Sequence, residues 1–377
     1  MLKYIFKVFG ITGSSINRAN INQAEIKNIL IVRQHNQLGD MLCSVPLFAA
    51  IRKKFPHAHI TLVASPLNYE ILFSDVNPYI DKVITYQKAP LKNLFEFYKE
   101  LKNHDYQIGI VPSTVSISRT SHFINFFSGA KIRVGVKSID DKINSVEYLL
   151  NVKSDFNWDT KKLHQVERNL DVGRQIDCDL TDDEKNNVMI HLSDDEIEFA
   201  ENFINENFPD KSSLIISFHP GAGKIPNRWS EKNFTQLINK LYNKYGCYIL
   251  LTSGAIDKEI TDEIKKKLKE QNIKCVVLEN TAIRKVGAVI KLSDLYITND
   301  TGTMHVAGGV DANLISLFGP TYGYEWAATG KNKFFIQSQT NDINDITVET
   351  VFETVCGMIE KIIENKKNFF RTLNRII

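Results

Sequence analysis

The sequence predicts an α/β protein made of two doubly wound domains, each a parallel sheet with helices on both faces. Three observations support this prediction. Short apolar runs of strand length alternate with longer amphipathic stretches along most of the 377 residues. The polar segment 177–183 interrupts the alternation, which then begins again, so this segment reads as a linker between two domains. In both halves, small residues and polar side chains follow a strand candidate directly, and this is where such sheets bind ligands.

The first half of the chain contains five strand candidates after a polar lead-in, residues 1–27. The strands are predicted at 28–33, 59–64, 82–86, 106–111 and 131–136. The helices are predicted at 42–55, 67–73, 91–102, 118–128 and 163–175. The helix at 42–55 ends before Pro56, because the residue that precedes a proline is disfavoured in helical geometry. We therefore expect a first domain at residues 28–180.

The second half repeats the pattern. Strands are predicted at 214–218, 247–252, 274–278, 294–299 and 313–318. Helices are predicted at 234–245, 257–271, 283–292 and 303–309, with a last helix at 347–365. We therefore expect a second domain at 190–345 and a C-terminal helix with a basic tail at 346–377.

The composition argues against several classes of protein. The formal net charge of +2 gives no reason to expect a nucleic-acid binder. The five cysteines include no CxxC pair, which argues against a structural zinc site or a disulfide framework and fits a reducing compartment. No apolar run approaches the roughly 18 residues of a membrane-spanning helix, and the N-terminus is not a convincing signal peptide. We expect a cytoplasmic protein.

Both ends of the chain combine basic residues with aromatic ones, in segments 1–9 and 366–377. Such segments favour peripheral contact with an anionic membrane surface. The alternative is a terminal helix that packs on its own domain, and the sequence does not decide between the two.

The most informative motif is Asp300-Thr-Gly-Thr-Met-His305, which lies between a strand candidate and a helix candidate. At such a turn the free N–H groups and the dipole of the helix N-terminus favour a phosphate or diphosphate. Asp300 is placed to cap the helix, and His305 lies one turn inside it, where its ring could face the ligand. The alternative is an ordinary turn followed by a packed or solvated histidine.

A second motif follows the first strand, in the segment Gln-His35-Asn-Gln-Leu-Gly39-Asp40. Gly39 allows a tight turn, and Asp40 is expected at the start of a helix, beyond the carboxyl end of a central strand. There its carboxylate could accept a proton from a substrate hydroxyl. The alternative is an N-cap aspartate. His35 is a weaker candidate for the base, and we expect it to be a loop or supporting residue.

The second domain opens with a loop of small residues, 218–230, that follows a strand candidate. Backbone N–H groups of small residues can approach a phosphate, and nearby cations can balance its charge. The loop is neither a Walker A loop nor a GxGxxG loop. We expect Trp229 in the core and Ser230 as a helix cap. The candidate phosphate-binding residues are Gly221, Ala222, Gly223, Lys224 and Arg228.

Another strand candidate of the second domain leads into Gly-Ala-Ile-Asp257-Lys-Glu259. A carboxylate there could accept hydrogen bonds from a ribose or sugar hydroxyl, although acidic residues also favour a solvated helix start. Asp177-Cys-Asp179 has the Asp-x-Asp spacing of metal-dependent sugar transferases, but it follows a helix and lies in the linker, so we assign it no role. No other cluster has metal-ligand spacing, and we expect no metal.

Taken in order, these motifs resemble glycosyltransferase family 9, the lipopolysaccharide heptosyltransferase family. The matching motifs of the first domain are Ile-Leu-Ile-Val-Arg33, Gly39-Asp40 and Pro46-Leu-x-x-Ala-Ile-Arg-x-x-Phe-Pro56. Those of the second domain are His219-Pro-Gly-Ala, Asn-Arg-Trp229, Asn299-Asp-Thr-Gly-x-Met-His305-Val-Ala and Leu-Phe-Gly-Pro-Thr321. The resemblance covers residues 28–330.

The resemblance implies a GT-B fold, in which two Rossmann-like domains face a central cleft and a C-terminal helix crosses back to the first domain. It implies inverting, metal-independent transfer of heptose from ADP-heptose to a lipid A–core acceptor on the cytoplasmic face of the inner membrane. The nucleotide sugar is a co-substrate, and no cofactor is implied. Asp40 matches the family's catalytic base, and Glu259 is our candidate for its ribose-binding acid. The residues that match its donor-binding turn are Asp300, Thr301, Gly302 and His305.

The sequence also departs from the family. Asn227 replaces a lysine that commonly lies two residues before the tryptophan of the second-domain loop, and Lys224 or Arg228 could replace its charge. Two other hypotheses therefore stay open. One is a GT-B transferase with a different nucleotide-sugar donor, and the other is a nucleotide-sugar-binding protein without turnover, in which Asp40 is only a cap. A dehydrogenase is disfavoured because no GxGxxG follows the first strand.

Overall fold

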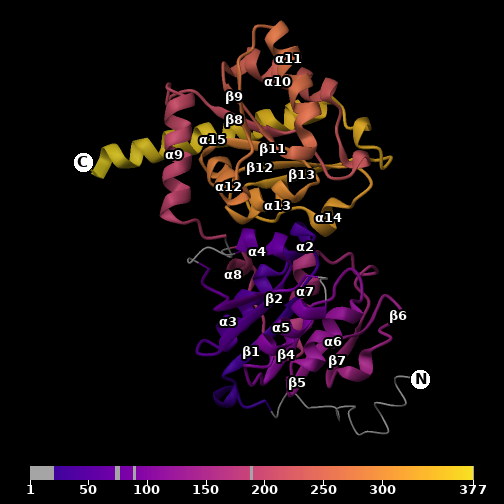
Figure 1. Ribbon diagram of the computed structural model, residues 1–377. Helices are drawn as coiled ribbons and strands as arrows, with labels where there is room; N and C mark the ends of the chain where they lie inside the picture. Colours follow the sequence, from indigo (N-terminus) through magenta and orange to yellow (C-terminus); the bar gives the residue numbers. More distant parts are fainter. Residues whose placement is uncertain (1–20, 73–76, 88–90, 187–189, 377) are drawn as a thin grey trace. The chain divides into compact units, whose positions relative to one another are not determined.

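The structure, a computed structural model, describes residues 21–72, 77–87, 91–186 and 190–376 (Figure 1). The chain divides into two units, Met1–His191 and Leu192–Ile377. Each unit contains a largely parallel sheet with helices packed against it, so the predicted class of two doubly wound α/β domains is confirmed. The predicted N-terminal membrane segment, 1–9, and the side chains of 367–377 lie outside the described residues. No described helix is long and apolar enough to span a bilayer.

The sheet of the first unit has the order β3-β2-β1-β4-β5-β6, with β7 paired to β5. β1 pairs in parallel with β2 on one side and with β4 on the other. The chain therefore leaves β1 and β4 toward opposite sides, which makes their carboxyl ends the topological switch point where such sheets bind ligands. The strands are β1 (Asn28–Arg33), β2 (His59–Ala64), β3 (Lys82–Thr85), β4 (Ile108–Ile110), β5 (Ile132–Ile139), β6 (Lys142–Ile143) and β7 (Val152–Phe156).

The helix after β1 differs from the prediction. Instead of one helix at 42–55, the chain forms α2 (Leu38–Leu42) and α3 (Val45–Lys54). Pro46 accounts for the new start, because the first turn of a helix accepts a proline that a helix interior does not. Asp40 lies in the first turn of α2, whose N-cap is Gln37, so the alternative that Asp40 is the N-cap is wrong. The other helices of this unit are α4 (Pro66–Leu72), α5 (Leu91–Leu101), α6 (Arg119–Phe127), α7 (Gln165–Arg174) and α8 (Asp182–Asn186).

The sheet of the second unit is fully parallel, with the order β10-β9-β8-β11-β12-β13. Its switch point lies between β8 and β11, which pair with each other. The edge strand β13 was not predicted. The strands are β8 (Ile215–His219), β9 (Tyr248–Ser253), β10 (Cys275–Glu279), β11 (Leu295–Asn299), β12 (Leu314–Phe318) and β13 (Lys333–Gln337).

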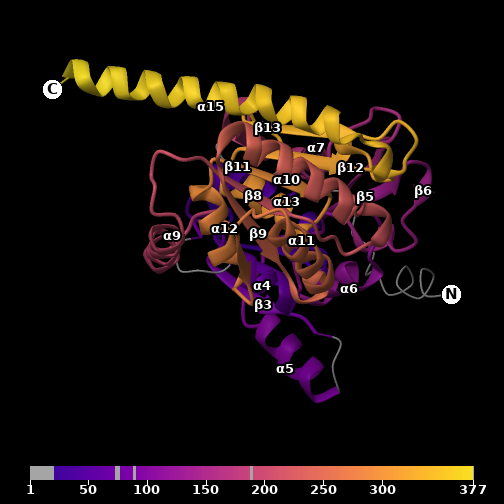
Figure 2. The same ribbon diagram turned by 90° about the horizontal axis from the view of Figure 1, so that it is seen from above.

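The helices of the second unit enclose a large core around Trp229, which is fully buried as predicted. Ser230 caps α10, also as predicted, by accepting a hydrogen bond from the Asn233 N–H. The long helix α15 contributes Val351, Val355 and Ile359 to this core and packs on α10 (yellow in Figure 2). The helices are α9 (Asp194–Asn207), α10 (Glu231–Tyr245), α11 (Lys258–Glu270), α12 (Ile283–Leu292), α13 (Gly302–Gly309), α14 (Gly323–Trp326) and α15 (Val348–Ile376).

Candidate active site

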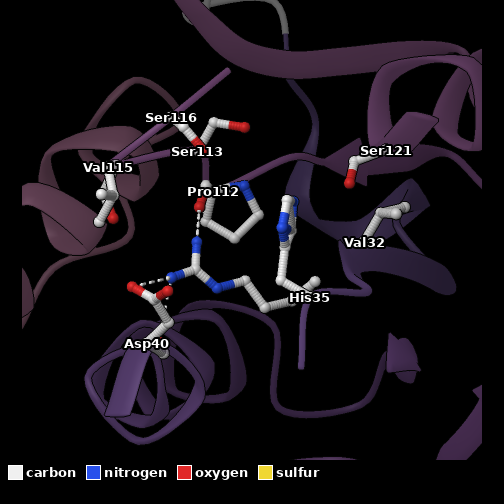
Figure 3. A pocket seen from close by; sticks show the side chains of 10 residues that line it. Val32, His35, Asp40, Pro112, Ser113, Val115, Ser116 and Ser121 are labelled. Atoms are coloured by element: carbon white, nitrogen blue, oxygen red, sulfur yellow. Dashed lines mark hydrogen bonds and ion pairs between the residues drawn. The ribbon is translucent and has the colours of Figure 1, made fainter. Parts of the chain in front are cut away.

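A small polar pocket lies at the switch point of the first unit, beyond the carboxyl ends of β1 and β4. Its volume of about 20 Å³ has room for about one water molecule or hydroxyl group. Figure 3 shows Asp40 at one side of the pocket, with His35 and the serines of the segment after β4 around it. The lining residues are Val32, Arg33, His35, Asp40, Pro112, Ser113, Thr114, Val115, Ser116 and Ser121.

Arg33 holds Asp40 at this pocket. Its Nη2 atom donates a hydrogen bond to the Asp40 backbone carbonyl at 3.0 Å and lies 3.4 Å from Asp40 Oδ1, while Nη1 donates to the Pro112 carbonyl (dashed lines in Figure 3). The guanidinium therefore ties the first turn of α2 to the segment after β4. Asp40 Oδ1 is buried and accepts no hydrogen bond from the described residues. The Asp40 carboxylate is therefore ion-paired to Arg33 and still has unused hydrogen-bonding capacity at the edge of the pocket.

His35 lines the same pocket, so the structure brings both candidate bases together. Burial, and then the charge of Arg33, lower the pKa of His35, which favours its neutral imidazole at neutral pH. Asn68 donates a hydrogen bond to the His35 carbonyl at 2.5 Å and so fixes the loop between β1 and α2.

In the second unit, the predicted phosphate loop follows β8 and is tied to the end of β11. Asn299 donates hydrogen bonds to the Pro220 carbonyl at 2.8 Å and to the Gly221 carbonyl at 3.2 Å. It also accepts one from the Trp229 N–H at 3.2 Å. The loop is therefore held at both ends by one buried amide. Gly221 and Ala222 are buried, Gly223 and Lys224 are exposed, and Arg228 is half-buried.

The turn before α13 lies beside the same loop. Asp300 accepts a hydrogen bond from Asn227 Nδ2 at 2.8 Å, so it does not cap α13 as predicted; the N-cap is Thr301. The pKa of Asp300 is raised, because the effect of burial exceeds the opposing effects of a hydrogen bond from Thr321 and of the charge of Lys224. Thr301 and Gly302 are half-buried at the N-terminus of α13.

His305 is buried inside α13, and its ring lies 6.3 Å from the ring of Trp326 in an edge-to-face arrangement. Glu259 is exposed on α11, whereas Asp257, two residues earlier, is buried beneath the phosphate loop. The sequence marked both carboxylates but could not tell which of them the fold would bury. It also missed the amides of Asn227 and Asn299, which join the loop to the β11–α13 turn. Asn227 belongs to the motif Asn-Arg-Trp229 and Asn299 to the motif Asn-Asp-Thr-Gly302, and their places in these motifs are the signal that could have found them.

The comparison with protein families decides the identity of the chain. The model of glycosyltransferase family 9 (heptosyltransferase) matches residues 94–355. The chain belongs to glycosyltransferase family 9. It is therefore a glycosyltransferase, as the motifs predicted, and its two Rossmann-like units confirm the GT-B class.

Individual members of family 9 agree with this assignment. The chain is 24% identical over 286 residues to lipooligosaccharide heptosyltransferase 2 of Campylobacter jejuni subsp. jejuni serotype O:2, covering 75% of this chain and 78% of the relative. It is 26% identical over 304 residues to lipooligosaccharide heptosyltransferase 2 of Haemophilus influenzae, covering 78% and 84%. A family 9 glycosyl transferase structure from Veillonella parvula has a TM-score of 0.76 at 18% identity, covering 91% of this chain and 99% of the other. The structure of the E. coli ADP-heptose LPS heptosyltransferase II has a TM-score of 0.70 at 21% identity, covering 90% and 100%.

Proposed function

We propose that the protein is an inverting, metal-independent glycosyltransferase that moves heptose from ADP-heptose to a lipopolysaccharide core or a related cell-envelope glycan. The observation that carries the proposal is the Asp40 side chain, which lines a hydroxyl-sized pocket and whose carboxylate is ion-paired to Arg33 but has an Oδ1 atom that accepts no hydrogen bond from the described residues. The choice of heptose and of the lipopolysaccharide acceptor is supported by the names of the relatives, several of which are lipooligosaccharide or lipopolysaccharide heptosyltransferases.

In the proposed reaction, Asp40 acts as the general base. The acceptor hydroxyl enters the pocket and donates a hydrogen bond to the Asp40 carboxylate. As the hydroxyl oxygen forms a bond to the anomeric carbon of the donor, its proton passes to Asp40. The bond from the anomeric carbon to the diphosphate breaks at the same time, and its electron pair leaves with ADP. Attack from the face opposite the leaving group inverts the configuration of the anomeric carbon.

The second unit supplies the groups that stabilise the leaving diphosphate. The half-buried Arg228 and the exposed Lys224 bring two positive charges to the loop after β8. The N–H groups of Thr301 and Gly302 lie at the N-terminus of α13, where the helix dipole favours negative charge. Fixed donors of this kind stabilise charge that develops in the transition state without having to reorganise.

The proposal makes no use of a metal ion, and an activity assay tests this directly. Purified protein is supplied with ADP-heptose or with UDP- and GDP-sugars, in EDTA, together with a heptose-deficient lipopolysaccharide core as acceptor, and release of nucleoside diphosphate is followed. We expect release from ADP-heptose that EDTA does not change. Release from another donor would replace the heptose assignment, and loss of activity in EDTA would contradict metal independence. No release from any donor would favour a nucleotide-sugar-binding protein without turnover.

Peripheral contact with the cytoplasmic face of the inner membrane, through the basic ends of the chain, is part of the proposal. Co-sedimentation with vesicles tests it. We expect the protein to bind vesicles that contain an anionic phospholipid and not vesicles of phosphatidylcholine alone, and to lose this binding in high salt. Equal recovery with both kinds of vesicle would contradict it.

A further inference from the structure

Asp257 is a buried acid that the proposed reaction does not use. It ends the 3-10 turn Ala255–Asp257 after β9, and 5% of its surface is exposed. Although it precedes α11, its side chain does not cap that helix. Within the described part of the chain, its Oδ1 atom is buried without a hydrogen-bond partner. A buried carboxylate in this state is costly unless a cation lies close to it.

Two basic side chains face this carboxylate. His219 Nε2 lies 3.6 Å from Oδ2, and Arg228 Nη2 lies 3.7 Å from Oδ1. His219 Nδ1 lies 3.0 Å from the Thr252 carbonyl, which only accepts hydrogen bonds, so Nδ1 carries the proton of the neutral ring. Burial lowers the pKa of His219, which favours this neutral ring at neutral pH. Arg228 therefore supplies the positive charge that Asp257 faces.

Arg228 and the phosphate loop are packed together on Asp257. Arg228 Nε donates a hydrogen bond to the Ala222 carbonyl at 2.8 Å, while 27% of the Arg228 side chain remains exposed. The guanidinium is thus anchored to the loop through Nε and faces Asp257 through Nη2, while part of the side chain stays exposed to solvent. Gly221 lies directly against the acid, since a Cβ atom added there would be 2.1 Å from Asp257 Cγ. The carboxylate therefore lies against both the loop and the arginine.

We propose that Asp257 is a positioning residue, which holds Arg228 and the loop 221–223 in the arrangement that binds the diphosphate of the donor, without touching the donor itself. This inference rests on the proposed function, because it takes the loop to be the diphosphate site. The proposed role of Asp257 differs from that of a ribose-binding acid, because the Asp257 carboxylate lies beneath the loop and faces Gly221.

The test is a double-mutant cycle with ADP as the probe, measured by calorimetry on the full chain. The variants are Asp257→Asn, Arg228→Gln and the two combined. Asparagine keeps the shape of the side chain and removes its charge. We expect Asp257→Asn to weaken ADP binding about tenfold and to have a clearly smaller effect when Arg228→Gln is present, because groups that act through one another are not additive. With donor and acceptor present, the donor KM should rise and kcat should fall, because a displaced Arg228 also stabilises the leaving diphosphate less well in the transition state.

Asp262→Asn is the matched control, because Asp262 is an exposed acid on α11 that pairs with Lys258, and it should leave ADP binding unchanged. Melting curves verify that each variant is folded, and Asp257→Ser replaces Asp257→Asn if the latter does not fold. Additive effects of the two substitutions, or wild-type affinity in Asp257→Asn, would overturn the inference while leaving the proposed function intact. A wild-type protein that binds none of ADP, UDP and GDP would overturn the donor site itself, and the inference with it.

Discussion

Gly221→Ala is expected to destabilise the second unit and displace the phosphate loop. The added methyl group would lie 2.1 Å from Asp257 Cγ and 2.2 Å from Oδ1. Non-bonded heavy atoms prefer about 3.5–4.0 Å, so the loop or the carboxylate must move by roughly 1 Å or more. The loop cannot move freely, because Asn299 holds the Gly221 carbonyl, and Asp257 is itself buried.

The magnitude follows from the cost of overpacking, which is typically about 1–3 kcal/mol. For a domain of 150–250 residues, each kcal/mol lowers Tm by roughly 2–4 °C, so the expected loss is about 2–12 °C. Melting curves followed by circular dichroism measure it. Gly223→Ala is the matched control, because a Cβ atom at Gly223 meets nothing within 4 Å, and its Tm should equal that of the wild type.

A Gly221→Ala protein that melts with the wild type would refute this packing argument. A second variant locates the cause of any loss. Asp257→Ala, added to Gly221→Ala, removes the atoms that the new methyl group meets and should restore part of the lost Tm. If the double variant melts at or below the single one, the contact with Asp257 is not the source of the strain.

Two further predictions concern the first unit. Thr114 lines the pocket beside Asp40, and its hydroxyl, among the described residues, is buried without a hydrogen-bond partner. Thr114→Val should therefore raise the acceptor KM about tenfold in steady-state kinetics, and Thr114→Ser should restore it. An unchanged acceptor KM in the valine variant would show that the hydroxyl does not contact the acceptor. His122 is satisfied as a neutral ring, since Nδ1 donates to the Ser118 carbonyl at 2.7 Å and Nε2 accepts from Asn144 at 3.0 Å. Burial lowers the pKa of His122, so the unfolded chain binds the proton of this ring more tightly than the folded chain does. The stability that the neutral ring contributes is therefore complete above about pH 6.5 and is lost as the pH falls below that value. Urea titrations should show a loss of up to about 1.4 kcal/mol from this residue at pH 5.5, and His122→Gln should lose less between pH 7.5 and 5.5 than the wild type; equal losses would contradict the assignment.

The strands that the sequence predicted best are those with continuous apolar runs. β1 and β2 have the predicted bounds, and all but the first residue of each is buried. β7 and β13 were missed because they lie at or near the edges of their sheets and are partly exposed. The residues of β7 form no apolar run, and the run in β13, Phe334-Phe-Ile336, is only three residues long. Helix α9 went unpredicted although the Ser193–Glu196 capping box that begins it is visible in the sequence.

The candidate site was predictable where it follows a buried strand. Asp40, the loop after β8 and the turn after β11 were found in this way, because the carboxyl ends of parallel strands are the usual ligand sites. Which of the two carboxylates, Asp257 or Glu259, would be buried was not predictable. It depends on a single 3-10 turn that buries Asp257 and leaves Glu259 exposed. The link from Asn227 to Asp300 joins residues far apart in the chain, which local patterns do not reveal.

The measurement that tests the central claim most directly compares Asp40→Asn with the wild type in two assays on the same protein preparations. One follows nucleoside diphosphate release with donor and acceptor, and the other measures ADP affinity by calorimetry. If Asp40 is the general base, kcat should fall by about 10²–10⁴ while ADP affinity and Tm stay unchanged. A variant that keeps wild-type kcat would contradict the proposed mechanism and leave Asp40 as a residue that only completes the first turn of α2.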